Sequence, residues 1–412
     1  MKLEQLQKYA ETVIKIGVNL QQGEKLVIKS PIETAEFART LATFAFEAGA
    51  GDVIIDWKDE LYSKIRYQKA PKDVFDSFPQ WKKDFHMQLA EDGAAFISIA
   101  ANDPELMKDV NPDVLMRHQK TINTALKEYR DRLMGNKNAW NVIAFPTKSW
   151  AKKVFPTLTE EKAVEKLGDA IITSVRADLS DPVAAWETHK RNLKERMDFM
   201  NHHQFKKLHF QNKLGTDLTL ELPEGHLWTA GAEVTQDGID FIANMPTEEV
   251  FTLPHRDGAN GRVVSSKPLP YNGNLIEDFS LTFQNGEVID FSAAKGYETL
   301  KGLLETDEGS LRLGEVALVP HDSPISNSGI LFFNTLFDEN ASCHLALGKA
   351  YPVCLKDGNK MTPEELASAG VNESLVHEDF MIGTSDMNIV GIRKDGKEIS
   401  IFKDGNFIDT KL

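Results

Sequence analysis

The sequence predicts an α/β N-terminal domain built on a mainly parallel sheet, followed by a β-rich α+β C-terminal domain. Short apolar runs alternate with helical segments over roughly the first 200 residues, and alternating strand patterns with glycine turns fill the remainder. The length of 412 residues gives room for two or three domains of roughly 150 residues each. We therefore expect domains at 1–200 and 201–412, with the boundary near 185–205.

The parallel sheet is predicted from four short runs rich in strand-forming residues: KLVIKS (25–30), DVIIDW (52–57), AAFISIA (94–100) and NVIAFP (141–146). Segments with helical periodicity lie between them, such as 34–50 and 113–133. Continuous apolar strands separated by helices are typical of a parallel sheet that is covered on both faces. A further helical region is expected from about 160 to 202, with a helix-start signal at Ser180-Asp181-Pro182.

The second half is predicted to be mostly antiparallel. Residues 208–223 read as a hairpin around Gly215-Thr216, and 269–294 show period-2 patterning around the turn signal Asn285-Gly286. The segment from Met381 onward repeats this pattern with Asp-Gly turns. A helix is expected at 362–370, where Thr362 would cap it and a proline would follow at the first helical position.

Composition excludes several classes of partner. Lys plus Arg number 47 and Asp plus Glu 62, so the formal net charge is −15 and neither nucleic acid nor an anionic membrane surface is an expected partner. The chain contains no run of about 18 apolar residues, so no membrane span is expected. The N-terminal amphipathic segment is broken by Glu11 and Lys15, unlike a signal peptide. Two cysteines, Cys343 and Cys354, do not make a disulfide framework, so we expect a cytoplasmic protein.

The α/β half shows no nucleotide-binding signal. The segment GAGD (49–52) follows a predicted helix and precedes a strand, which is the wrong order for a phosphate-binding turn. Neither GxGxxG nor GxxxxGK[ST] occurs. The candidate site residues lie in the second half instead.

Two glutamates interrupt apolar stretches there. In PTEEVFTLP (246–254), a strand would place Glu249 on the face of Phe251 and Glu248 on the opposite face; the alternative is a solvated pair on an edge strand. In LRLGEVALVP (311–320), Glu315 heads a buried strand, which is costly unless the carboxylate is paired or binds a metal. The alternative is an exposed strand end beside a turn at Gly314.

Two histidines accompany them. His377 and Asp379 are two apart on a predicted strand and project from one face, as two ligands of one metal should; a histidine–carboxylate hydrogen bond is the alternative. The stretch DENASCHLALGKAYP (338–352) contains His344. Its neighbour Cys343 would point the other way on a strand, as a small buried apolar side chain.

Together these side chains form a set of carboxylates and imidazoles within one β-rich domain: Glu249, Glu315, His344, His377 and Asp379. Carboxylates bridge two cations and imidazoles complete their coordination, so the set suits a pair of zinc-like divalent ions. Because the set has no thiolate, the metals would keep open positions for water and substrate.

Five segments resemble the M29 family of metallo-aminopeptidases, the aminopeptidase T and aminopeptidase S group. They are NMPTEEVFT (244–252), VSSKPL (264–269), GEVALVP (314–320), FDENASCHLALGKAYP (337–352) and HEDFMIG (377–383). The stretches EKLVIKSP (24–31) and WNVIAFPTKSWAKKVFP (140–156) also resemble the family's first domain, so the resemblance covers nearly the whole chain. It implies an exopeptidase that removes the N-terminal residue from peptides with two divalent metal ions (Zn, Co, Mn or Mg), and it implies a homodimer.

The resemblance also assigns roles. The five residues Glu249, Glu315, His344, His377 and Asp379 match the family's metal ligands, with Glu315 as the bridging carboxylate. Glu339 matches a family glutamate that is either the general base or a further ligand. Tyr351 matches a family tyrosine that acts on the substrate carbonyl. Two other functions stay open: a dinuclear hydrolase of other amides or of phosphoesters, and a non-catalytic, metal-stabilised peptide-binding protein.

Overall fold

The computed structural model describes residues 2–272 and 274–408, which divide into two compact units. Residues up to Lys190, Ala232–Thr247 and Phe332–Leu336 form the first unit. Arg191–Gly231, Glu248–Leu331 and the described residues from Phe337 onward form the second. The division into independently folding domains at 1–200 and 201–412 stays a prediction.

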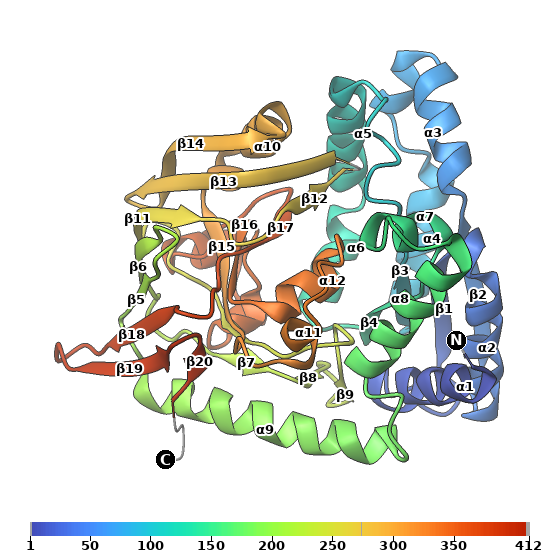
Figure 1. Ribbon diagram of the computed structural model, residues 1–412, viewed down its shortest axis with the longest axis horizontal. Helices are drawn as coiled ribbons and strands as arrows, with labels where there is room; N and C mark the ends of the chain where they lie inside the picture. Colours follow the sequence, from blue (N-terminus) through green and yellow to red (C-terminus); the bar gives the residue numbers. More distant parts are fainter. Residues whose placement is uncertain (1, 273, 409–412) are drawn as a thin grey trace. The chain divides into compact units, whose positions relative to one another are not determined.

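The first unit contains a four-stranded parallel sheet in the order β2-β1-β3-β4, surrounded by helices (Figure 1). Its strands are β1 (Lys25–Pro31), β2 (Asp52–Lys58), β3 (Ala95–Ala100) and β4 (Trp140–Ala144). Its helices are α1 (Leu3–Thr12), α2 (Ala35–Glu47), α3 (Glu60–Lys69), α4 (Gln80–Glu91), α5 (Pro112–Ala125), α6 (Lys127–Met134), α7 (Lys148–Val154) and α8 (Glu160–Ser174). The short pair β8 (Glu233–Val234) and β9 (Asp240–Phe241) also belongs to this unit. The predicted α/β architecture is confirmed.

One predicted helix is broken in a way that periodicity does not reveal, and the break in a longer helical region follows the predicted start signal. The segment 113–133 forms α5 and α6, because the chain leaves helical geometry at Leu126 with φ −99° and ψ 14°. The region 160–202 forms α8 and α9 (Pro182–His203). The predicted start of α9 is confirmed, since the Asp181 carboxylate accepts a hydrogen bond from the backbone N–H of Ala184 at 2.9 Å.

The second unit is mainly antiparallel, as predicted, and is built on two sheets. The five-stranded sheet has the order β17-β16-β15-β10-β7, and the larger sheet runs β12-β13-β11-β6-β5-β18-β19-β20 with β14 beside β13. The strands are β5 (Lys207–Gln211), β6 (Asp217–Glu221), β7 (Thr229–Ala230), β10 (Val250–Thr252), β11 (Ala259–Val264), β12 (Leu269–Tyr271), β13 (Asn274–Gln284), β14 (Glu287–Lys295), β15 (Leu313–Leu318), β16 (His344–Gly348), β17 (His377–Met381), β18 (Asn388–Ile392), β19 (Glu398–Lys403) and β20 (Asn406–Phe407). The remaining helices are α10 (Tyr297–Leu304), α11 (Pro324–Asn327), α12 (Thr335–Asp338) and α13 (Pro363–Ser368).

Local turn chemistry explains the hairpins. Asn285 and Gly286 both have positive φ (50° and 82°), as a tight turn between β13 and β14 requires. Asp404 and Gly405 do the same between β19 and β20. The cap of α13 is also as predicted: the Thr362 hydroxyl accepts the N–H of Glu365, whose carboxylate accepts the N–H of Thr362.

The main core of the second unit lies between its two sheets. Phe210 and Leu281 of the larger sheet and Val316, Leu345 and Phe380 of the five-stranded sheet belong to one buried cluster. Because side chains alternate along a strand, the residues next to these point to the opposite face of the five-stranded sheet. No helix among the described residues is long and apolar enough to cross a membrane.

Candidate metal centre

Strand register brings the five predicted ligands onto one face of the five-stranded sheet. Val316, Leu345 and Phe380 are aligned across β15, β16 and β17 and point into the core. Glu315, His344 and Asp379 are each one residue away from an aligned core residue, so they point to the other face. His377 shares the face of Asp379, and Glu249 directly precedes β10, the neighbour of β15.

The five side chains meet as two triads that share Glu315. His344 Nε2 lies 3.1 Å from Glu249 Oε2 and 3.5 Å from Glu315 Oε1. His377 Nε2 lies 3.7 Å from Glu315 Oε2 and 3.6 Å from Asp379 Oδ1. Within each triad, one atom from every residue lies within 4.8 Å of the others. Each oxygen of Glu315 therefore faces a different imidazole, which is the arrangement expected of a bridging carboxylate.

Burial decides against the solvated alternatives. Glu248 and Glu249 are only 4 % and 7 % exposed, and β10 lies between β15 and β7 rather than at an edge, so the solvated edge pair is wrong. Glu315 is 5 % exposed. Gly314 lies inside β15 at a register shift, where a Cβ would come 2.4 Å from the carbonyl oxygen of Gly348. The expected turn at Gly314 is therefore wrong, and glycine is needed there for close backbone packing.

The hydrogen bonds of the two histidines leave the same nitrogen available for a cation. His377 Nδ1 lies 2.6 Å from the carbonyl oxygen of Lys349, and His344 Nδ1 lies 3.1 Å from that of Glu339. A carbonyl only accepts, so Nδ1 carries the hydrogen in both rings and the neutral imidazoles present a lone pair at Nε2. In each triad, the Nε2 lone pair faces carboxylate oxygens, and this arrangement suits a cation between the nitrogen and the oxygens.

Unsatisfied carboxylate oxygens point to the same conclusion. Among the described residues, buried Asp379 Oδ1 has no hydrogen-bond partner. Buried Glu249 Oε2 faces His344 Nε2 at 3.1 Å but forms no well-aligned hydrogen bond with it. At 3.6 Å the His377–Asp379 pair is too long for a hydrogen bond, which removes that alternative for the H-x-D pattern. Buried anionic oxygens without donors are costly unless a cation compensates them. These residues fit divalent metal ions.

The electrostatics of the cluster follow from burial and crowding. The pKa of Glu315 is raised to about 7. Burial is the main cause and His344 opposes it, while the carboxylates of Asp379 and Glu249 add to the rise. Burial lowers the pKa of His344, but Glu249 and Glu315 outweigh this and hold it well above its usual range. Without cations, such a cluster binds protons in their place.

The two predicted catalytic residues lie beside this cluster. Glu339 begins the 3₁₀ turn Glu339–Ala341 and is 5 % exposed; burial and the charges of Asp379 and Glu249 raise its pKa well above the usual range. The ring of Tyr351 packs edge-on against that of His377, with centroids 4.8 Å apart. Cys343 is buried in the core on the opposite face, as expected, and its thiol donates to the carbonyl oxygen of Val319.

Sequence reasoning passed over two groups that contact these residues. The Asn340 amide donates to Glu339 Oε1 at 3.3 Å, and its place beside two acidic residues in DENASCH was a signal that could have singled it out. The carbonyl of Lys349 orients His377, but a backbone oxygen leaves no trace in the residue types.

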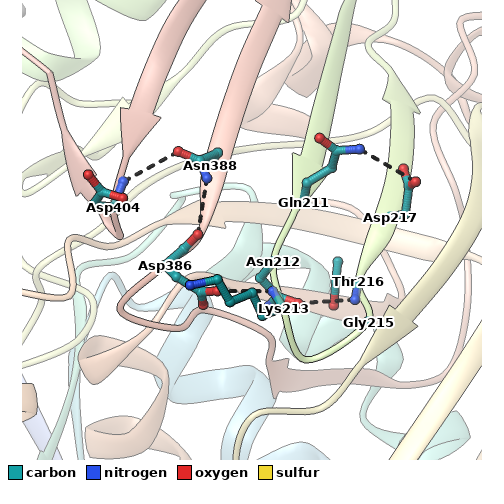
Figure 2. Close-up of a pocket in the computed structure, with 9 residues that line it drawn as sticks. All are labelled: Gln211, Asn212, Lys213, Gly215, Thr216, Asp217, Asp386, Asn388 and Asp404. Carbon is teal, nitrogen blue, oxygen red and sulfur yellow. Dashed lines mark hydrogen bonds between the residues drawn. The ribbon is translucent and has the colours of Figure 1, made fainter.

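A second acidic cluster in this unit has a different character. A pocket of about 420 Å³ at the β5–β6 turn is lined by Gln211, Asn212, Lys213, Gly215, Thr216, Asp217, Asp386, Asn388 and Asp404 (Figure 2). Its polar groups bond to one another: Asp386 Oδ2 accepts the N–H of Lys213 at 3.0 Å, and Asn388 Oδ1 accepts that of Asp404 at 3.4 Å. The satisfied, open pocket gives no case for a metal.

Comparisons with known proteins agree with the motifs. The model of the thermophilic metalloprotease (M29) family matches residues 2–407. Aminopeptidase 2 of Geobacillus stearothermophilus is 50 % identical over 404 residues, and aminopeptidase AmpS of Bacillus subtilis (strain 168) is 46 % identical, each over 98 % of both chains. The structure of wild-type AmpT from Thermus thermophilus matches with a TM-score of 0.90 and 39 % identity, over 98 % of this chain and 99 % of that one.

The family match covers almost the whole described chain, and the curated relatives match it from end to end. The resemblance drawn from the five motifs is thereby confirmed. The chain belongs to the thermophilic metalloprotease (M29) family and is a metal-dependent hydrolase acting on peptide bonds.

Proposed function

We propose that this protein is an aminopeptidase that removes the N-terminal residue from peptides with two divalent cations. The observation that carries the proposal is the position of Glu315 in both triads, with one oxygen facing each imidazole. The relatives that match the whole chain are named aminopeptidases, which supports the exopeptidase assignment.

The two triads divide the ligands between the cations. Glu249, His344 and Glu315 Oε1 would hold one ion, and His377, Asp379 and Glu315 Oε2 the other. Carboxylate and imidazole ligands suit Zn, Co, Mn and Mg alike, so the donor set does not select one of these metals. Two metal ions per chain are the expected content.

Bound cations polarise the scissile carbonyl and lower the pKa of the attacking water. Glu339 takes the proton of that water and returns it to the leaving amine nitrogen, as a general base and then a general acid. The Tyr351 hydroxyl donates to the carbonyl oxygen as negative charge develops there. A metal ion or a spare carboxylate that bound the substrate's α-amino group would restrict cleavage to the first residue.

Cleavage of leucyl-anilide tests this function. The chelated protein should be inactive, and adding Zn, Co, Mn or Mg back one at a time should restore turnover with at least one of them. Turnover of phosphate esters without the anilide would instead indicate another dinuclear hydrolase. If chelation melts the fold and no metal restores turnover on either substrate, the protein is a non-catalytic, metal-stabilised binder.

We also propose a homodimer in the cytoplasm. The homodimer rests on the family resemblance, and light scattering coupled to size-exclusion chromatography tests it. The cytoplasmic location is supported by the cysteines: both Cys343 and Cys354 are buried thiols without a disulfide. Cell fractionation tests the location, and recovery outside the cytoplasm would contradict it.

A further inference from the structure

A buried asparagine side chain joins the predicted general base to the segment that carries the first metal ligand. Asn340 is 0 % exposed and follows Glu339 in the 3₁₀ turn Glu339–Ala341. An asparagine amide offers one oxygen as acceptor and one NH₂ group as donor, and a buried amide needs partners for both. The roles of these two atoms are therefore set by what each one faces.

The side-chain oxygen of Asn340 accepts a hydrogen bond from the backbone just before β10. Asn340 Oδ1 accepts the N–H of Glu248 at 2.7 Å, one residue before Glu249. The hydroxyl of Ser323 donates to the carbonyl oxygen of Asn340 at 3.3 Å and holds its backbone. A backbone N–H cannot accept a hydrogen bond, so the amide has only one satisfactory orientation.

That orientation turns the donor toward Glu339. Asn340 Nδ2 lies 3.3 Å from Glu339 Oε1 and donates to it. The bond restrains Oε1 and with it the orientation of the whole carboxylate. It also links the rotamer of Glu339 to the segment on which Glu249 is placed.

We propose that Asn340 is a positioning residue that holds the Glu339 carboxylate in its proton-accepting orientation. The proposal rests on the proposed function, in which Glu339 is the general base. In the chemical step Asn340 acts through Glu339, so loss of its amide donor alone should affect that step and leave metal binding and substrate affinity in place.

The test is Asn340→Asp in the metal-loaded enzyme, because this change keeps the shape and the acceptor for Glu248 but removes the amide donor. The new carboxyl either repels Glu339 or shares a proton with it, and both outcomes impair proton acceptance. We expect kcat to fall about 10- to 100-fold, part of the 10²–10⁴-fold that general base catalysis contributes. KM should stay within about threefold and metal content per chain should be unchanged.

Asn201→Asp is the matched control. The Asn201 amide also bridges two partners, accepting the N–H of Trp228 and donating to its carbonyl oxygen, both at 2.9 Å. Neither bond involves the metal centre, so this variant should lose some stability and keep kcat. If Asn340→Asp does not fold, Asn340→Ala also removes the donor. Because it removes the acceptor of the Glu248 N–H as well, its kcat is compared per bound metal, and the same fall is expected.

A double-mutant cycle with Glu339→Gln separates positioning from general damage. In that background the Asn340 change should cost less than about threefold, because the group it serves is already lost. An equal loss in both backgrounds, an unchanged kcat in the single variant, or a fall in metal content would overturn the proposal. Full activity of Glu339→Gln alone would show that Glu339 is not the general base and would contradict the proposed mechanism itself.

Discussion

The second unit contains two groups of acidic side chains that resemble each other in composition and differ in environment. Glu249, Glu315 and Asp379 lie against two imidazoles on a covered sheet face, where burial raises the pKa of Glu315 to about 7. Asp217 and Asp386 line the open pocket of Figure 2, and hydrogen bonds from His209, and from Thr384 and the N–H of Lys213, lower their pKa values.

The difference shows that the number of carboxylates does not identify a metal site. In the open pocket, the His209 imidazole, the Thr384 hydroxyl and the backbone N–H of Lys213 satisfy the charges one by one. In the buried cluster, among the described residues, Asp379 Oδ1 has no hydrogen-bond partner and Glu249 Oε2 has no well-aligned one. Buried charge without donors is tolerated when a cation or a proton compensates it, so the buried cluster is the better candidate for a metal site.

The largest effect is expected from Glu315→Gln. An amide keeps the shape of the side chain but loses the charge that both triads share, so metal content and activity should fall together. The loss of activity should exceed about 100-fold, the upper end for residues that only support a ligand. Metal analysis and anilide turnover measure both quantities.

Asp386→Asn is the matched change in the open pocket, and it should leave metal content and turnover unaltered. A variant Glu315→Gln with full activity, or an equal loss from Asp386→Asn, would erase the distinction between the two clusters.

Tyr351→Phe should have the next largest effect. The phenyl ring keeps its packing against His377 but cannot donate to the substrate carbonyl oxygen. We expect kcat to fall up to about 10²-fold, as for other single oxyanion donors, with metal content unchanged. Loss of metal from this variant would assign Tyr351 a structural role at the second triad instead.

The affinity of the buried cluster for metal should depend steeply on pH. Glu315 has a raised pKa of about 7, and those of His344 and His377 are raised as well, so cations must displace protons as the pH falls through 7. Each displaced proton weakens binding about tenfold per pH unit. Calorimetric titration of the chelated protein between pH 6 and 8 in buffers of different ionisation enthalpy counts the released protons; pH-independent binding would contradict this account.

The smallest effect concerns the stability of the chelated protein. The pKa of Glu315 is raised above its ordinary 4.5, so the stability from its bound proton is present below pH 4.5 and lost as pH rises through about 7. The raised pKa values of His344 and His377 act in the same direction. Urea unfolding should show the metal-free protein losing stability from pH 5 to 8, and the metal-loaded protein losing less. A rise in the stability of the chelated form over this range would contradict these pKa shifts.

Sequence by itself determined the features that depend on near neighbours in the chain. Asn285-Gly286 specified a tight hairpin because both residues adopt positive φ at low cost, and Thr362 with Pro363 specified a helix start. Alternation along the strand placed His377 and Asp379 on one side without any knowledge of partners. The residue types and the family resemblance also singled out the five side chains that the structure brings together as the candidate metal centre.

Tertiary structure alone decided how those side chains meet. The division of Glu315 between two triads follows from the register of β15 against β16 and of β16 against β17, which pairs residues far apart in the chain. The contact of Asn340 with Glu248 likewise joins distant segments, and the break at Leu126 is invisible to periodicity. Turns and helix caps depend on a few adjacent residues, so the sequence could predict them. Strand pairing and burial depend on the whole fold, so only the tertiary structure reveals them.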